Sequence, residues 1–291
     1  MASVIPVNIR NKLLSAKDIS LELVKRFNDD HCFSTAASLS YTTLLALVPF
    51  ATVVFSVLSL FPVSEYWSNT MEKFLFDNFV PAAGETVRGY IHEFSTQAGK
   101  LTAVGLVFLL FSSLSLLATI EDSFNDIWKV TKGRKWFQRL LIYWALLTLG
   151  PVLIAVSLSM SSALLSTTFL SDQGLIASFT ETLLRYLPIL LELCAFMLFY
   201  QSIPNLEVKF SDSFFGALIA TVLFEITKFG FGFWILNFNS YELIYGALAT
   251  IPVFFVWVFL CWIVMLVGAL ISAILRERRE RLIVAKVTVA G

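Results

Sequence analysis

The sequence predicts an all-α integral membrane protein with six transmembrane helices. Its composition is the first reason: 57% of the residues are hydrophobic and 14% are charged, whereas about 25% are charged in a typical soluble domain. Six long apolar segments and an asymmetric distribution of Lys and Arg are the second and third reasons. A chain this apolar cannot shield its surface from water by folding alone, so part of its solvent must be lipid.

The apolar segments are long enough to cross a membrane, which takes about 20 residues for roughly 30 Å of hydrocarbon. They are continuous rather than alternating, and this favours helices over a β-barrel. Glu192 interrupts the fourth segment, and Glu225 and Lys228 interrupt the fifth. The six predicted spans are residues 32–64, 101–120, 140–171, 186–203, 213–236 and 243–275.

The Lys and Arg residues between the spans predict the orientation, because cytoplasmic loops are enriched in them. Sixteen lie in the N-terminal arm, in the loops after the second and fourth spans, and in the C-terminal tail. Three lie in the segment between the first and second spans. This distribution predicts that both termini are cytoplasmic, in agreement with an even number of spans.

The N-terminal arm, residues 1–31, contains a short amphipathic stretch. Leu23, Val24 and Phe27 share one helical face, with Lys25 and Arg26 beside it. Such a pattern is typical of an interfacial helix on an anionic inner leaflet. We therefore expect the arm to lie on the cytoplasmic membrane surface.

The connection between the first and second spans, residues 64–100, carries two further apolar groups at helical spacing, separated by Pro81 and Gly84. We expect two amphipathic helices on the outer membrane surface, and a cap packed on the transmembrane bundle is the alternative. The predicted organisation thus has three parts: the N-terminal arm (1–31), the transmembrane domain (32–275) and a basic cytoplasmic tail (276–291). The two groups are Met71, Phe74, Leu75 and Phe79, then Val87, Tyr90, Ile91 and Phe94.

Three charged residues lie within predicted spans: Glu192, Glu225 and Lys228. A charge inside a membrane costs about 2.5–3.5 kcal/mol on insertion scales, so such residues mark function by default. Glu225 and Lys228 are three residues apart and share a helical face. Helical rise places all three residues in one layer of the outer half of the bilayer, where Lys228 can pair with either carboxylate. A purely structural ion pair between the fourth and fifth helices is the alternative.

The first predicted span begins with a hydroxyl-rich stretch that includes Ser38 and Tyr41. Ser34, Ser38 and Thr42 repeat every four residues, which is typical of close helix packing through small side chains. The functional alternative is the polar wall of a cavity that Tyr41 faces. With the three intramembrane charges, Ser38 and Tyr41 form the predicted substrate pathway.

Residues typical of soluble enzymes are scarce. The two histidines, His31 and His92, are predicted on opposite sides of the membrane, and no HExxH, GxSxG, P-loop or zinc-binding cysteine motif is present. We therefore predict no cofactor, no metal site, no direct use of ATP and no ribonuclease activity. The basic loops follow from the orientation, so no nucleic-acid partner is expected.

Several hydrophobic motifs follow one another along the chain: Ala37–Pro49, Thr148–Pro151, Leu223–Glu225 with Lys228, Ile244–Leu248 and Ile251–Trp257. Their order and number make the sequence resemble the YihY/virulence factor BrkB family of bacterial inner-membrane proteins over nearly its whole length. The resemblance implies six helices and an inner-membrane location, and some members long carried a ribonuclease BN label. Relatives often have Gly-Ala-Glu late in the sixth helix, whereas this chain has Leu270 at the third position.

Two functions lead from the sequence, and an intramembrane enzyme is the third that stays open. The favoured one is a transporter of lipid or another amphiphile, because of the intramembrane charges, the hydroxyl-rich first span and the amphipathic outer segment. The alternative is a membrane scaffold or envelope-integrity factor, in which the charges only hold helices together. Membrane lipids are the expected partners in both cases, and a homo-oligomer is left open.

Overall fold

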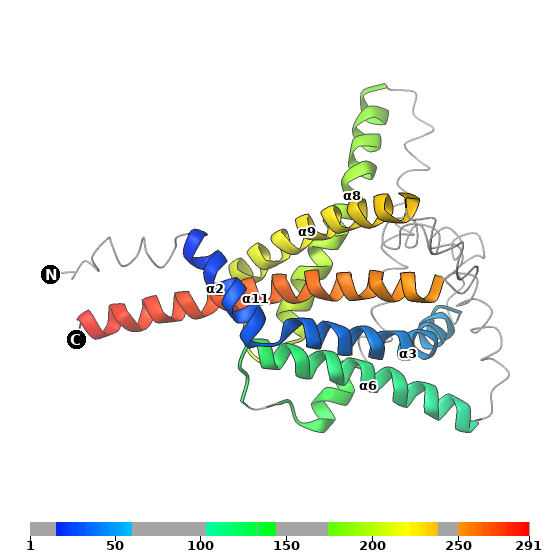
Figure 1. The fold of residues 1–291 in the computed structure, drawn as a ribbon, viewed down its shortest axis with the longest axis horizontal. Helices are drawn as coiled ribbons and strands as arrows, with labels where there is room; N and C mark the ends of the chain where they lie inside the picture. Colours follow the sequence, from blue (N-terminus) through cyan, green and yellow to red (C-terminus); the bar gives the residue numbers. More distant parts are fainter. Residues whose placement is uncertain (1–15, 60–102, 132, 144–173, 238–249, 291) are drawn as a thin grey trace.

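A computed structural model describes residues 16–59, 103–131, 133–143, 174–237 and 250–290. Across these residues the chain forms seven helices and no strand, in agreement with the predicted all-α class (Figure 1). Residues 64–100 and most of the third predicted span lie outside the described residues. The helices are α2 (Ala16–Asp29), α3 (Cys32–Ser59), α6 (Ala103–Ile127), a short helix at 136–143, α8 (Gly174–Ser202), α9 (Phe210–Asn237) and α11 (Thr250–Ala290).

Two of the described helices are long and apolar enough to cross a membrane. These stretches are Phe210–Ile235 in α9 and Ile251–Ala285 in α11, and they correspond to the fifth and sixth predicted spans. Shorter apolar helical stretches, Cys32–Leu47 and Pro188–Ser202, fall in the first and fourth predicted spans. The six-span topology as a whole therefore stays a prediction.

Helix α11 is the centre of the bundle. In Figure 1 it runs between α9 on one side and α3 with α6 on the other, and it packs against both α9 and α3. Leu266, Leu270 and Ile274 of α11 are completely buried there. Helix α8 packs mainly on α9. Leu270, at the position where the family resemblance implied an acidic residue, is thus a core residue in this chain.

Two glycines allow α9 and α11 to approach closely. A Cβ atom added to Gly216 would lie 2.6 Å from the carbonyl oxygen of Gly268, and one added to Gly268 would lie 2.3 Å from the Tyr200 hydroxyl. Ala220 and Ser272 continue the same small-residue contact four residues later on each helix. Small residues at a helix crossing are typical of membrane bundles, where they bring the backbones together.

Helix α11 is far longer than the span predicted for it. It continues without interruption from Thr250 to Ala290, a total of 41 residues. At 1.5 Å per residue this is about 60 Å, twice the thickness of the hydrocarbon core. The predicted basic tail is therefore a continuation of the last helix as far as Ala290.

Helix α2 is packed on the bundle through part of its apolar surface. Leu23 and Phe27 contact the core, whereas Leu21 and Val24 are each 62% exposed. The apolar residues grouped from the sequence are thus divided between two faces. α2 lies across α11, as Figure 1 shows, and also contacts α3.

The turns after α2 and α6 depend on two residues with left-handed backbone, His31 (φ 52°) and Lys129 (φ 53°). At the end of α6, the Val130 amide donates to the Asn125 carbonyl at 2.9 Å, and the Lys129 amide donates to the Asp126 carbonyl at 3.1 Å. This is the Schellman arrangement that terminates many helices. It directs the Lys129 side chain towards α2.

Candidate functional site

The three charges that the sequence placed inside predicted spans form one cluster, here called the charged triad: Glu192 on α8, and Glu225 and Lys228 on α9. Lys228 Nζ lies 2.6 Å from Glu225 Oε1 and 3.6 Å from Glu192 Oε2. The Lys228 ammonium also lies 5.3 Å from the ring centre of Phe224. Lys228 therefore contacts both carboxylates, as its position in the sequence allowed.

The members of the triad differ in burial. The Glu192 side chain is 4% exposed, that of Lys228 is 15% exposed and that of Glu225 is 37% exposed. Both carboxylate oxygens of Glu192 are buried and have no hydrogen-bond partner in the described part of the chain. The triad thus joins a buried carboxylate to a more accessible one through a single ammonium group.

The triad lies far from the turn that connects α8 to α9. Glu192 is ten residues before the end of α8, and Glu225 is fifteen residues after the start of α9. At 1.5 Å per residue these positions are about 15 Å and about 22 Å from the turn along each helix. Their carboxylates therefore lie well within the helical hairpin.

Ser38 and Tyr41, the other residues of the predicted pathway, lie on α3. Both are exposed, Tyr41 to 61%, while α3 packs on α6 and α11 through other residues. The hydroxyl group of α3 that contacts α11 is that of Thr43, which accepts a hydrogen bond of 3.0 Å from Trp262 Nε1. The structure thus does not bring Ser38 and Tyr41 to the charged triad. Thr43 belongs to the same hydroxyl-rich stretch, but the sequence had not assigned it to the pathway.

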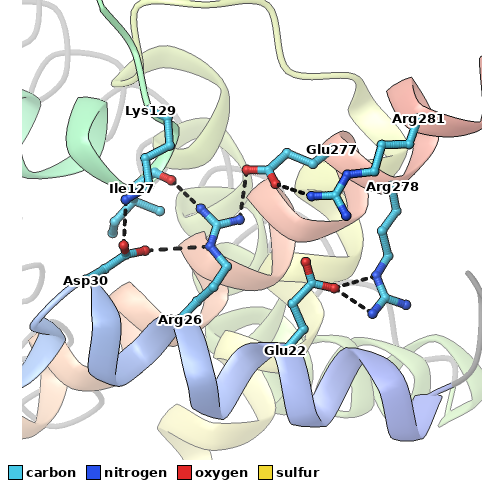
Figure 2. Close-up of polar contacts among 8 residues, drawn as sticks. All are labelled: Glu22, Arg26, Asp30, Ile127, Lys129, Glu277, Arg278 and Arg281. Atoms are coloured by element: carbon cyan, nitrogen blue, oxygen red, sulfur yellow. Dashed lines mark hydrogen bonds and ion pairs between the residues drawn. The ribbon is translucent and has the colours of Figure 1, made fainter. Parts of the chain in front are cut away.

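A second polar region, here called the polar end, comprises α2, the turns after α6 and α8, and the part of α11 after Ile274. Its centre is Arg26, which donates to Glu277 Oε1 at 2.8 Å and to the Ile127 carbonyl at 2.9 Å (Figure 2). Asp30 lies 3.6 Å from Arg26 and 2.5 Å from the Lys129 ammonium. Arg26 and Asp30 together connect α2 to both α6 and α11.

A second ion pair joins the preceding turn of α2 to α11. Arg278 donates from Nε and Nη2 to one oxygen of Glu22, at 2.8 and 2.6 Å (Figure 2). The Arg278 side chain is 7% exposed and that of Glu22 is 23% exposed. The sequence had treated Arg278 only as an indicator of orientation, and Arg26 also as part of an interfacial helix. The spacing of Glu22 and Arg26, one helical turn apart, was the signal that they share a face.

Glu121 at the end of α6 is completely buried among donors. It accepts a 2.6 Å hydrogen bond from the Tyr143 hydroxyl, and Arg139 and Arg134 lie 3.3 and 3.6 Å from its oxygens. Arg139 also donates to Asp122. Burial acts to lower the pKa of Arg139, but this hydrogen bond and the neighbouring Tyr143 and Glu121 outweigh it and raise the pKa above its usual value.

Arg134 holds the turn between α8 and α9. Its guanidinium group donates to the carbonyls of Ser202, Ile203 and Pro204 at 2.8, 3.0 and 3.2 Å. These carbonyls end α8, where a cation is favourable. Asn125 Oδ1 accepts a further 2.8 Å bond from the Asn205 amide. The hairpin that carries the triad is therefore fixed at its turn.

No group of three His, Cys, Asp or Glu side chains able to hold a metal ion is found among the residues with a described position. The polar end and the charged triad differ in how their charged side chains are paired. The polar end consists mostly of mutually paired side chains between helices. The charged triad contains an unequal number of positive and negative groups inside two apolar helices.

Comparison with known proteins identifies relatives along most of the chain. A family model described as "Virulence factor BrkB" matches residues 23–287. A UPF0761 membrane protein of Photobacterium profundum is 45% identical over 258 residues, which cover 89% of this chain and 81% of the relative. A UPF0761 membrane protein of Legionella pneumophila is 39% identical over 273 residues, covering 94% of this chain and 65% of the relative. No solved structure matches the chain.

Proposed function

The chain belongs to the virulence factor BrkB family and is an integral membrane protein, and from this premise we propose that it transports a lipid or another amphiphile across the bacterial inner membrane. The proposal includes six spans with both termini in the cytoplasm. The charged triad is the observation that carries it. Glu192, Glu225 and Lys228 are the residues proposed to meet the substrate.

The unequal charges of the triad favour function over simple helix association. A structural pair of one carboxylate and one ammonium needs no third group, and even such a pair is often no more stable than apolar residues of equal size. A second carboxylate inside the helices adds a further cost. A second carboxylate in this place is expected if it acts on a substrate or an ion.

The surface around Glu225 fits an amphiphile. Val222, Ile226, Phe229 and Phe233 form an exposed apolar stripe on α9, with Phe229 80% exposed. Glu225 is within one helical turn of the first three, so its partly exposed carboxylate adjoins the stripe. A polar head group at the triad would leave acyl chains beside these apolar side chains. The expected substrate therefore combines a polar head with an apolar tail.

A scaffold without transport is the alternative, and the polar end favours it. There, ion pairs and hydrogen bonds join α2, α6 and α11 without involving the triad. In a scaffold, Lys228 would only hold α9 to α8 through Glu192, and Glu225 would be its second partner on α9. Replacing both charges by neutral residues of similar size would then have little consequence.

The double variant Glu225→Gln/Lys228→Met separates the two functions. Proteoliposomes would be loaded with phosphatidylethanolamine that carries a fluorescent acyl chain, and its movement between leaflets would be followed. We expect at least a tenfold loss of flux with a melting temperature close to that of the wild type. Complementation of a deletion strain extends the test to other substrates.

A matched control is Glu280→Gln/Arg276→Met. These two residues also form an ion pair within one helix, with 2.9 Å between Arg276 Nη2 and Glu280 Oε1, but they lie in α11 beyond the predicted span. The control should retain flux and complementation. Full flux and full complementation by the Glu225/Lys228 double variant would overturn the transport site and support the scaffold.

A further inference from the structure

We propose that Glu192 is a proton-binding site inside the membrane, which takes up and releases a proton while Glu225 stays paired with Lys228. The site is assigned from the geometry of the triad and from the burial of Glu192. The binding of the proton stands on that geometry. Its use as a driving force for transport rests on the proposed function.

The distances from Lys228 Nζ show that the carboxylates of Glu225 and Glu192 interact with it to different extents. Lys228 Nζ is in hydrogen-bond contact with Glu225 Oε1 at 2.6 Å, but it lies 3.6 Å from the nearer oxygen of Glu192. The ammonium group therefore mainly compensates Glu225. Glu192 is left with a weaker interaction with the same cation and with the negative charge of Glu225 close by.

The surroundings of Glu192 supply little else to stabilise a negative charge. From α9 it faces Glu225 and Lys228, and from α11 the thiol of Cys261 lies near enough to interact with it. Both Glu192 oxygens are buried without a hydrogen-bond donor among the described residues. An ionised carboxylate in such a place is costly, and protonation removes that cost.

Glu121 provides the contrast within the same molecule. It is also buried, but it accepts a hydrogen bond from Tyr143 and lies beside Arg139 and Arg134. Two cations and one donor stabilise its negative charge, whereas Glu192 shares one cation with a second carboxylate. Burial alone therefore does not distinguish the two glutamates, and the number of compensating groups does.

The proposed step is a simple exchange. A proton from water binds one oxygen of the Glu192 carboxylate to give the neutral acid, and no other bond forms or breaks. The triad then has one carboxylate and one ammonium, and its net charge changes from −1 to zero. Loss of the proton restores the charge and strengthens the attraction of Lys228 towards Glu192. In this way the proton would control how Lys228 is shared between α8 and α9.

Infrared spectroscopy of the full chain in lipid nanodiscs tests the proposal directly, because a protonated carboxyl group has a C=O stretch that a carboxylate lacks. We expect the wild type to show a protonated-carboxyl band at neutral pH that disappears on titration to higher pH. Glu192→Gln should remove this band, and Glu121→Gln, the matched control at the other buried glutamate, should retain it. Absence of the band in the wild type, or its persistence in Glu192→Gln, would overturn the site.

A second variant keeps the test decisive if Glu192→Gln does not fold. Lys228→Met removes the shared cation, so the titration of the band should move to higher pH, and an unchanged titration would count against the proposal.

Flux in proteoliposomes with an imposed pH gradient distinguishes this inference from the proposed function. Flux that does not depend on the pH gradient would contradict proton coupling but not proton binding. Absence of flux for every lipid probe would contradict transport, and proton binding would then be judged from the infrared result.

Discussion

Arg26 in α2 donates a 2.8 Å hydrogen bond to Glu277 in α11, a residue 251 positions later in the chain (Figure 2). The same guanidinium group binds the Ile127 carbonyl at the end of α6. One side chain thus joins three helices that are distant in the sequence. Helix α2 is thereby part of the bundle.

Removing Arg278 should destabilise the protein more than removing any exposed arginine of α11. The change Arg278→Gln leaves Glu22 without its partner in a mostly buried place, where such a loss typically costs about 3 kcal/mol. The free energy of unfolding in mixed micelles measures the effect. The control is Arg281→Gln, whose side chain is 61% exposed and should contribute less than about 0.5 kcal/mol. Equal effects of the two changes would contradict the importance of the Glu22–Arg278 pair.

The close contact of α9 with α11 predicts a strong effect of a single methyl group. In Gly268→Ala the new Cβ would lie 2.3 Å from the Tyr200 hydroxyl and 2.8 Å from Ala220 Cβ, and overpacking of this kind costs about 1–3 kcal/mol. We expect a clearly lower melting temperature.

Gly230→Ala is the matched control for that substitution. Gly230 also lies in a helix, but no atom is found within 4 Å of a Cβ added there. Alanine is preferred over glycine in helices by about 1 kcal/mol, so this variant should be as stable as the wild type or slightly more stable. A Gly268→Ala variant that behaves like Gly230→Ala would show that the two helices are further apart than described.

The distribution of Lys and Arg predicts the topology. Reporter fusions after Gly133 and after Lys286 should give cytoplasmic signals, and a fusion near Asp172 should give an external one, because basic loops stay in the cytoplasm. The measurement is a pair of reporters that are active on opposite sides of the membrane. An external signal after Gly133 would reverse the proposed orientation.

The purified protein should not cleave RNA. His31 and His92 are predicted on opposite membrane faces, where they cannot share a metal ion, and no catalytic motif of a soluble nuclease is present in the sequence. Cleavage of labelled RNA would be followed through several purification steps. Activity that copurifies with the protein and disappears in Asp122→Ala or His31→Ala would refute the prediction.

Some features of this protein follow from the sequence because they depend on neighbours along one helix. The length and apolarity of α9 and α11 define two candidate spans without reference to any other residue. The contact between Lys228 and Glu225 has the same origin, since residues three positions apart lie on one helical face. The membrane class, the all-α fold and one of the two contacts within the charged triad were therefore predictable.

Only the tertiary structure decided which distant residues meet. It placed Glu192 beside Lys228, directed Tyr41 and Ser38 away from the bundle, and paired Glu22 and Arg26 of α2 with Arg278 and Glu277 of α11. Helical periodicity fixes the relative directions of side chains on one helix, but not the rotation of that helix about its axis or its choice of neighbours. Those depend on close packing, such as the contact of Gly216 with Gly268, which involves residues more than fifty positions apart.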